Sequence, residues 1–516
     1  MIINAIHSAL GRGAGHYTPS GSWQLATGHY EPTTTTPEII FPRQAQTSSA
    51  YVYNKAHPNV PWRLPVGMLW GEWPFKVELS GAPSGMTIGQ YYSDGALYQI
   101  MEWSSTSKTP GTYNFSVIFT TQAGNQYSSD VSLEVTTTGF IFVDEANGGA
   151  SVANGGSATG VFDDPFVSMN DWYAGATGGT GSGTVADSTY ADYTVIYRTG
   201  TYAVTDCYVT AASPGYTLYM NNGGQKPFNH MAYPGESVEL DTSGAQMQWI
   251  DTQQGLICFS GITFPGTTIN SRYRNIQIAS GHNDILFFEC DFGTGVGVGG
   301  ANPACIMISA GTYQSSYVGF IGGTYAPGTD VNAIELYNTD KTLVENTTLT
   351  NSSGGSGWYF KESATGWCVR NCRGSSGDHI AVKYDNMNHF APTYAELSWS
   401  YFNCPSSEGF EIGRTTLTSF GGTIGRVNCF RNTLVCTYNY LKGAADGDVT
   451  TTRNIIIQDG TYSGGWYVDN TIPYAGTFTA TEDLVGISSD NIIDGSGNLI
   501  GAYLSTYAGI RGHIPV

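Results

Sequence analysis

The sequence predicts an all-β protein in which a parallel β-helix, a solenoid of stacked coils, follows a β-sandwich. The main observation is a strand pattern that returns four times between residues 332 and 415. In each copy two apolar residues alternate with polar ones: Ile334 and Leu336, Trp358 and Phe360, Ile380 and Val382, and Phe410 and Ile412. An alternation with period two predicts strands with one buried face. No pattern of helical length separates these strands, so we expect them to stack on one another in parallel.

A second set of residues recurs at intervals of 23 to 33 positions, each in a short motif such as Thr-Tyr or Asn-Cys. Its members are Phe292, Tyr325, Leu349, Cys372, Cys404, Cys429 and Tyr462. A repeat of this length, with occasional insertions, fits one coil of a parallel β-helix, in which each coil buries its inward residues against its neighbours. We therefore expect these residues to point inward in one column. A propeller or sandwich would instead need hairpin turns between antiparallel strands.

The composition supports a β architecture and limits the partners. Of the 516 residues, 67 are Gly and 34 are Tyr, and charged residues make up only 12%. This mixture is typical of turn-rich β-proteins. The net charge of −20 argues against nucleic acid as a partner, because phosphate binding requires a basic surface. No apolar run approaches the roughly 18–20 residues of a membrane span.

All nine Cys lie after residue 200, within the predicted solenoid. Their number is odd, and three belong to the inward column, which favours reduced, buried thiols over a disulfide framework. The sequence does not contain the two C-x-x-C motifs that would indicate a structural zinc site. From the residues alone we assign no metal ligands.

Residues 1–37 are expected to form an extended arm and linker, because they are polar, rich in Gly and end in EPTTTTP. They lack the charged and apolar regions of a secretory signal. The body of the chain nevertheless has the composition of an extracellular surface protein. A viral structural protein that leaves its host by lysis reconciles the two, so we expect a virion or extracellular location.

Residues 38–137 predict a separate β-domain. Apolar residues alternate in GTYNFSVIF (111–119) and in DVSLEV (130–135), and the loop QAGNQ joins them, which predicts a hairpin. The pattern resembles the immunoglobulin- or cadherin-like modules of bacterial and viral surface proteins, without the paired Cys of antibody domains. The resemblance implies a role in spacing or in attachment to other virion proteins.

Residues 138–480 are expected to form the solenoid and residues 481–516 a C-terminal cap. Asp164 as an N-cap, Pro165 after it, and apolar residues up to Trp172 predict a short helix near 165–174 that closes the open end. The passage from FVD (142–144) to DDPF (163–166) resembles the opening segment of pectate-lyase-like right-handed β-helices. Phage tailspikes and depolymerases are of this kind, and the resemblance implies a homotrimer.

In the predicted register, outward residues of neighbouring strands lie about 4.8 Å apart. One outward column would hold Glu335, Tyr359, Ala381 and Glu411, and the next Tyr337, Lys361, Lys383 and Gly413. Asp378, His379 and Arg414 would lie at the strand ends. The insertion 385–396 would overhang this face with the aromatic residues Phe390 and Tyr394, suited to stacking on sugar rings. Seven of the 21 Lys and Arg residues lie between 361 and 431, which predicts a basic patch on an acidic protein.

Two families of β-helix enzymes resemble this region. SGDHIAVKYD (376–385) followed by SEGFEIGRT (407–415) resembles polygalacturonase-type hydrolases, which makes Asp378 the general acid. The second Asp of that family is His379 here, and its His is Glu408, so the resemblance lacks a base. The same coils resemble lyases of the chondroitinase and alginate-lyase type. In that comparison Asp378 matches a calcium ligand, Lys383 the base and Arg414 a neutralising cation, but a second acidic ligand falls on Ser376.

Taken together, the sequence predicts a virion-associated or secreted protein that binds polysaccharide. The catalytic candidates are Lys383, Arg414 and Asp378, and the substrate-binding candidates are Lys361, Tyr359, Glu411, His379, Phe390 and Tyr394. A uronate lyase fits the basic patch better than a glycoside hydrolase, because elimination needs charge neutralisation beside a base. Calcium is implied only by the lyase resemblance. Outward charges on a solenoid are often only solvated, so a non-catalytic fibre, spike, capsid-decoration protein or adhesin stays open.

Overall fold

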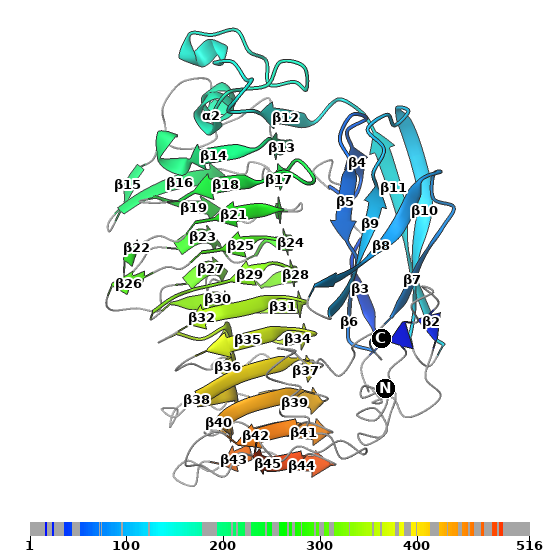
Figure 1. Ribbon diagram of the computed structural model, residues 1–516, viewed down its shortest axis with the longest axis vertical. Helices are drawn as coiled ribbons and strands as arrows, with labels where there is room; N and C mark the ends of the chain where they lie inside the picture. The colour runs from blue at the N-terminus through cyan, green and yellow to red at the C-terminus, as the bar shows by residue number, and fades with distance from the viewer. Residues whose placement is uncertain are drawn as a thin grey trace.

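The protein is described here from a computed structural model. The described residues are 16–17, 23–24, 36–43, 52–71, 73, 75–93, 96–121, 124–177, 193–207, 210–212, 215–221, 229–242, 245–249, 257–265, 268–270, 274–279, 281–293, 296–298, 304–308, 314–329, 331–352, 355–361, 364–376, 381–385, 394–398, 400–412, 423–430, 432–441, 446–452, 455–458, 466–468, 477–481 and 484–488. They form an antiparallel β-sandwich beside a long parallel β-solenoid (Figure 1). Before the sandwich, β1 (His16–Tyr17) pairs with β2 (Trp23–Gln24).

The sandwich consists of short sheets that are antiparallel apart from one parallel pair, β4 with β11, and it has one apolar core. Its strands are β3 (Glu38–Phe41), β4 (Lys55–Ala56), β5 (Trp62–Pro65), β6 (Gly67–Leu69), β7 (Lys76–Ser80), β8 (Met86–Ser93), β9 (Ala96–Trp103), β10 (Gly111–Thr120) and β11 (Gln126–Val135). The predicted hairpin is confirmed, since β10 and β11 pair antiparallel from Gly111 opposite Val135 to Thr120 opposite Gln126. Phe115, Val117 and Phe119 are buried at alternate positions, as the sequence pattern required.

The solenoid is built on two long sheets, and the predicted parallel stacking is confirmed. The 12-stranded sheet contains β12 (Phe140–Val143), β13 (Thr194–Tyr197), β17 (Asn229–Ala232), β20 (Ile257–Ser260), β24 (Asn283–Phe288), β28 (Ser315–Ile321), β31 (Thr339–Glu345), β34 (Gly366–Arg370), β37 (Tyr394–Ser398), β39 (Thr423–Phe430), β41 (Asp446–Thr452) and β44 (Thr477–Thr481). All of its neighbouring strands run parallel, from β12 beside β13 to β41 beside β44.

The 20-stranded sheet contains two rows of stacked strands and supplies the rest of each coil. Its strands are β14 (Gly200–Ala203), β15 (Thr210–Ala212), β16 (Gly215–Asn221), β18 (Val238–Asp241), β19 (Ala245–Trp249), β21 (Ile262–Phe264), β23 (Arg274–Ile278), β25 (Asp291–Phe292), β27 (Ala304–Ile308), β29 (Thr324–Tyr325), β30 (Asn332–Tyr337), β32 (Thr348–Ser352), β33 (Trp358–Lys361), β35 (Arg373–Ser376), β36 (Val382–Asp385), β38 (Tyr401–Ile412), β40 (Thr433–Leu441), β42 (Ile455–Gln458), β43 (Trp466–Val468) and β45 (Leu484–Ser488). A small separate pair joins β22 (Thr268–Asn270) to β26 (Val296–Val298). Because β45 pairs with β42, the coils continue past residue 480, where we expected them to end.

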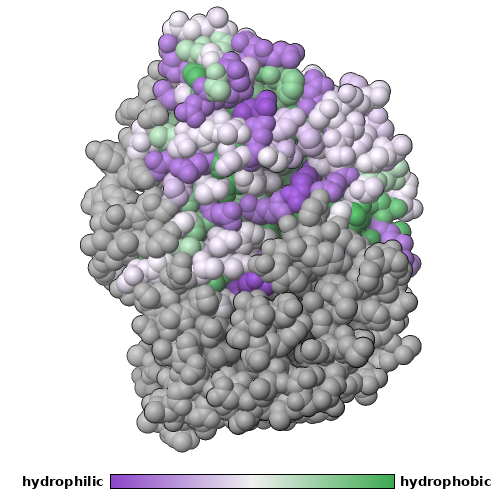
Figure 2. All heavy atoms as spheres, viewed as in Figure 1, coloured by the Kyte–Doolittle hydropathy of each residue, from purple (hydrophilic) through white to green (hydrophobic). Residues whose placement is uncertain are grey.

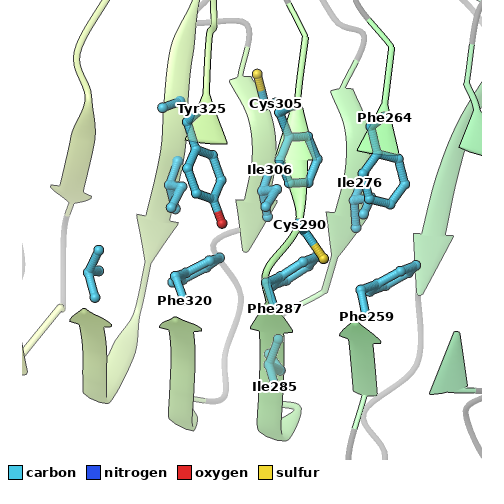
Figure 3. Close-up of a cluster of buried hydrophobic side chains, with 14 of the residues drawn as sticks. Phe259, Phe264, Ile276, Ile285, Phe287, Cys290, Cys305, Ile306, Phe320 and Tyr325 are labelled. Atoms are coloured by element: carbon cyan, nitrogen blue, oxygen red, sulfur yellow. The ribbon is translucent and has the colours of Figure 1, made fainter. Parts of the chain in front are cut away.

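The solenoid core contains stacked aromatic rings from successive coils. Phe259, Phe287 and Phe320 lie parallel with ring centroids 5.2 Å apart at each step (Figure 3). A second stack joins Phe292 to Tyr325 with centroids 5.2 Å apart. Offset stacking of this kind stabilises beyond the burial of area alone, so the coil repeat is reinforced by like residues in register.

The predicted inward column is confirmed in its first half and wrong in its second. Phe292 pairs with Tyr325, and Tyr325 with Leu349, as expected. The next partner of Leu349 is Gly374 rather than Cys372, which precedes β35. Cys404 lies two residues beyond the true column member in β38, and Cys429 belongs to β39 in the other sheet. All three Cys are nevertheless buried. The repeated motif therefore predicted correctly that these residues are buried, but not which position of the coil each one occupies.

The thiol prediction is confirmed for the described side chains. Eight Cys are free and buried, and Cys436 lies outside that description. Burial raises the pKa of Cys290 to about 12 and that of Cys305 to about 12. These thiols therefore act as small apolar groups in the core.

A helix closes the first end of the solenoid, as predicted, but it starts later. Helix α2 spans Met169–Thr177, and Trp172 and Tyr173 are buried against the first coils. Asp164 is not its N-cap, since this carboxylate accepts hydrogen bonds from the amide and hydroxyl of Thr159. Short 3₁₀ helices at Val152–Asn154 and Val204–Asp206 flank this end. Within the described residues, no helix is long and apolar enough to cross a membrane.

The sandwich lies along the outer face of the 12-stranded sheet (Figure 1). Leu286, Phe288, Ile321 and Leu343 of that sheet share one buried cluster with the sandwich core. Arg370 is fully buried beneath the sandwich and donates to the carbonyl of Met68 at 2.7 Å. On the face drawn in Figure 2, the coloured surface is mostly hydrophilic or neutral, with hydrophobic residues in small groups. The sandwich therefore covers apolar solenoid surface.

Candidate functional site

The candidate site lies on four neighbouring strands of the 20-stranded sheet, β30, β33, β36 and β38. Their inward register joins Ile334, Trp358, Val382 and Phe410, all fully buried. The outward register joins Glu335, Tyr359, Lys383 and Glu411. Lys383 therefore occupies the place that we predicted for Ala381. The predicted register was wrong by two residues at β36, while the predicted alternation of inward and outward residues was right.

Six outward side chains of these strands form a connected group, which we call the lysine–glutamate cluster: Glu335, Tyr337, Tyr359, Lys361, Lys383 and Glu411. At its first end, the Lys361 ammonium donates to Glu335 and, at 3.0 Å, to the Tyr337 hydroxyl. The Tyr337 hydroxyl donates in turn to Glu335 Oε1 at 2.9 Å. A single carboxylate oxygen thus accepts from an ammonium and a phenol.

The second end of the cluster pairs Lys383 with Glu411. Lys383 Nζ lies 3.2 Å from Glu411 Oε1. The ring of Tyr359 connects the two ends, because its centroid is 4.2 Å from Lys361 Nζ and 5.1 Å from Lys383 Nζ. Both distances fall within the range of cation–π attraction, so the two lysines are held around one ring instead of facing each other.

Most of the cluster is buried although it lies on the outward side of the strands. The side chains of Glu335, Lys361 and Glu411 are 0%, 6% and 3% exposed, and Tyr359 is also buried. The exceptions are Lys383, with 21% of its side chain exposed, and Tyr337, which is half-buried. The alternative of freely solvated charges therefore does not hold for Glu335, Lys361 and Glu411, while the substrate-binding roles of Tyr359, Lys361 and Glu411 stay predictions. Among the two lysines of the cluster, Lys383 is therefore the one that solvent reaches.

Glu335 keeps one acceptor atom unused. Its Oε2 is buried and has no hydrogen-bond partner among the described residues, while Oε1 accepts from both Lys361 and Tyr337. A buried carboxylate without its full set of donors is costly unless a cation lies close by. Lys361 therefore supplies the cation that stabilises the buried carboxylate of Glu335.

The other predicted site residues are separated from this cluster or fall outside the description. Asp378, His379, Phe390 and Arg414 lie outside the described residues, so their roles stay predictions. Tyr394 is placed elsewhere. It begins β37 in the 12-stranded sheet, is buried, and its ring meets Trp70 of the sandwich edge-on at 5.7 Å. Its predicted role in sugar stacking is wrong, because the sandwich covers it.

The predicted basic patch does not form one surface either. Arg370 is buried under the sandwich, where it pairs with Glu345 and faces the ring of Phe75. Burial raises the pKa of nearby Glu396, while Arg370 acts in the opposite direction. The sequence carried no signal for this second polar cluster, because it depends on which side of the solenoid the sandwich covers. Among the described residues, no group of His, Cys, Asp and Glu could hold a metal ion.

Comparisons with known proteins do not assign a function to this chain. No protein-family model and no curated protein matches the sequence. A rhamnogalacturonan lyase structure is similar with a TM-score of 0.38 at 15% identity, over 73% of this chain and 95% of that one. The surface adhesin PfbA of Streptococcus pneumoniae is similar with a TM-score of 0.31 at 11% identity, over 64% and 91%. The catalytic domain of an alpha-1,3-glucanase in complex with tetrasaccharides gives 0.21 at 10%, over 82% and 89%. None of these TM-scores reaches 0.5, so we transfer no role from these proteins.

Proposed function

We propose that the protein binds polysaccharide at the outward face of the 20-stranded sheet, with Lys383 as the primary contact. The observation that carries this proposal is the position of Lys383. It is the partly exposed cation of a group of ammonium, carboxylate and phenol side chains in which Glu335, Tyr359, Lys361 and Glu411 are buried, on a regular parallel sheet. Because its partners are held in place, Lys383 can meet a ligand with little loss of side-chain freedom.

The chemistry of the cluster suits sugar hydroxyls. An ammonium group donates hydrogen bonds and the neighbouring carboxylate of Glu411 accepts them, so a pair of hydroxyls could be bound from both sides. Strands of the sheet follow one another at about 4.8 Å, which presents similar positions in a straight line. A linear polymer is the ligand that such a face can follow over several coils.

Hydrolysis by the carboxylates of this cluster is not supported. Glu335 and Glu411 are separated by two intervening strands, which corresponds to roughly 14 Å at the usual strand spacing. Glycosidases place their two carboxyl groups about 5–9.5 Å apart. The distance is too long for either the retaining or the inverting arrangement.

Elimination from a uronate is the second candidate function. It is favoured by the partial exposure of Lys383, which allows a substrate to approach this one cation of the cluster. To accept a proton, Lys383 would have to leave Glu411. The accompanying roles of Arg414 and Asp378, and of a calcium ion, rest on the family resemblance alone. For this reason binding without cleavage is the first proposal.

The test compares full-length protein and two lysine variants on a panel of acidic and neutral polysaccharides. Lys383→Ala should weaken binding of the recognised glycan by roughly tenfold or more, the value of one charge-assisted hydrogen bond. Lys76→Ala is the control, since Lys76 pairs with Glu78 on the exposed face of the sandwich. Equal binding by Lys383→Ala and wild type, or no binding to any glycan, would reject the proposal and leave a structural virion protein or an adhesin of another kind.

The same panel separates binding from cleavage. Release of unsaturated, ultraviolet-absorbing oligosaccharides that depends on Lys383 would establish the lyase. New reducing ends without that absorbance, with loss of activity in Asp378→Asn, would establish a hydrolase instead. Binding with neither product supports the first proposal.

We also propose a secreted or virion-associated location, with the arm 1–37 or the sandwich attaching the solenoid to other virion proteins. The surface-protein composition and the docked sandwich support this setting. Detection of the protein in purified particles or in culture supernatant tests it. Sedimentation analysis of the purified protein distinguishes the expected homotrimer from a monomer.

A further inference from the structure

Five residues that are neither Gly nor Asn have a left-handed backbone conformation, and all five lie where the sandwich meets the solenoid. Eight described residues other than Gly have positive φ, and three of them are Asn, which adopts this region readily. The other five are Trp70 (φ 56°), Asp284 (59°), Glu289 (49°), Tyr317 (62°) and Lys341 (53°). Apart from Asp, these residue types rarely take a left-handed conformation, because the Cβ atom crowds the following carbonyl.

Three of the five form one chain of contacts with the first sandwich strand and the residues after it. Arg43 donates to both carboxylate oxygens of Asp284, at 3.1 and 3.0 Å, and its guanidinium carbon lies 3.5 Å from the ring centre of Tyr317. Lys341 donates to Glu38 at 2.8 Å and to the Tyr317 hydroxyl at 2.9 Å. These solenoid residues occupy equivalent positions in β24, β28 and β31.

The other two make contacts further along the interface. Glu289 accepts from two nitrogens of Arg63, one of them at 3.0 Å, and Arg63 also binds Glu102 within the sandwich at 3.0 Å. Trp70, from the sandwich side, meets the ring of Tyr394 at 5.7 Å. Each strained residue therefore uses its side chain across the interface.

Glu289 lies at a corner of the solenoid, directly after β24. Neighbouring coils show that this corner does not need a large side chain. Glu289 follows Phe288, and the residues at the same corner of the neighbouring coils are Gly261 and Gly322, with φ of 68° and 69°. Further along, the corner holds Asn346 and Asn371. Gly or Asn would make the turn at lower cost. A strained backbone conformation persists only where contacts with neighbouring residues hold it in place. Here the sandwich makes those contacts.

We infer that the docked sandwich is a permanent clamp on the coils of β24, β28 and β31, maintained at the expense of backbone strain. It covers Leu286, Phe288 and Leu343, which would otherwise form an exposed apolar patch. This patch is covered by the sandwich of the same chain, because only residues 136–139 connect β11 to β12. This inference concerns the interface alone and does not depend on glycan binding.

Hydrogen–deuterium exchange of the full chain tests the clamp. Glu289→Gly relieves the strained corner and removes the Arg63 contact, and Asn346→Gly is the matched control at the same corner two coils on. If the corner were only a turn, Gly would be neutral or favourable in both variants. We expect exchange in β6 and β24 to speed up by roughly tenfold or more in Glu289→Gly alone, because local opening follows the loss of cross-interface contacts.

Arg63→Gln provides the same test from the sandwich side without changing the strained backbone. It should raise exchange in the same two strands, and the double variant should open no more than the single ones, since both remove one contact. Exchange as slow as wild type in both Glu289→Gly and Arg63→Gln would overturn the inference. If Glu289→Gly does not fold, the Arg63→Gln result decides.

Discussion

Lys361 and Glu335 form an ion pair in which both side chains are buried, although both residues lie on the outward side of their strands. Such a pair contributes little net stability relative to an apolar replacement, but either member becomes costly when the other is removed. The Tyr337 hydroxyl binds both partners and makes the group rigid. The pair therefore positions the cluster around Tyr359 and Lys383.

Breaking this pair should destabilise the protein strongly. We expect Lys361→Met or Glu335→Gln to lower the free energy of unfolding by about 3–5 kcal/mol, because each leaves a buried charge without its partner. The double variant should recover much of the loss. Urea unfolding measures all three. The control is Lys76→Met, at an exposed pair with Glu78, where a change below about 1 kcal/mol is expected; equal effects at the two sites would contradict the buried pair.

The cluster shows what the sequence pattern could and could not predict. Alternation placed Glu335, Tyr359, Lys383 and Glu411 on the outward side, and that assignment is correct. It could not decide whether Ala381 or Lys383 stands beside Tyr359, because a slip by two residues preserves the alternation. The burial of Lys361 and Glu411 was missed for a related reason. Polar residues on one face of a strand indicate its outward side, but they do not show whether neighbouring side chains cover that side.

Truncation in the aromatic stack should be as costly as truncation in a globular core. Phe287 lies between Phe259 and Phe320, is fully buried, and belongs to the main core cluster. Phe287→Ala should cost about 3–5 kcal/mol of unfolding free energy. Val161→Ala at an exposed site should stay within about 0.5 kcal/mol. A loss below about 1 kcal/mol at Phe287 would mean that neighbouring coils close over the cavity.

Acid should weaken the first coils through His230. Burial lowers the pKa of His230 to about 3, and its ring stacks between Tyr197 and Phe259. The unfolded chain, in which a His has a pKa of about 6.5, binds this proton more readily than the folded chain between pH 6.5 and 3. Stability is thus fully present above about pH 6.5 and falls as the pH drops towards 3, by about 1.4 kcal/mol per pH unit for one proton.

His230→Phe keeps the ring stack and removes the titrating group. In equilibrium unfolding at a series of pH values, this variant should show a shallower loss of stability between pH 6 and pH 4 than wild type. His57, whose pKa burial lowers to about 4, contributes with the same sign and accounts for part of the remaining slope. An unchanged slope in His230→Phe would show that His230 does not control the acid response.

Reductant should not change the thermal stability. The eight described Cys are free and buried, so no disulfide is available to be reduced among them. The melting temperature should be the same with and without dithiothreitol. Alkylation by iodoacetamide should require unfolding, because burial excludes the reagent from all eight thiols and also raises the pKa of Cys290 and Cys305. A drop in melting temperature on reduction would indicate a disulfide and contradict the prediction of free thiols.

The fold was more predictable than the interface. Repeated residues such as Phe292, Tyr325 and Leu349 reveal the coil because each buries against its own equivalent in the next coil. Contacts between Arg43 and Asp284, or Arg63 and Glu289, join segments more than 200 positions apart with no repeat to connect them. They depend on which face the sandwich covers, and a single sequence does not carry that information. The strained conformation of Glu289 is equally invisible, since Glu is an ordinary surface residue in sequence.

The clamp also sets an order of events during synthesis. Met68 and its partner Arg370 are 302 positions apart, so the ribosome completes the sandwich long before the coils that receive it exist. At about 5–20 residues per second this interval is roughly 15 to 60 s. Throughout that time the docking surface around Trp70 and Phe75, which is buried in the finished molecule, stays open to solvent and to other nascent chains. High expression rates should therefore favour aggregation through the N-terminal region, and slower synthesis or a chaperone that binds apolar surface should raise the yield of folded protein.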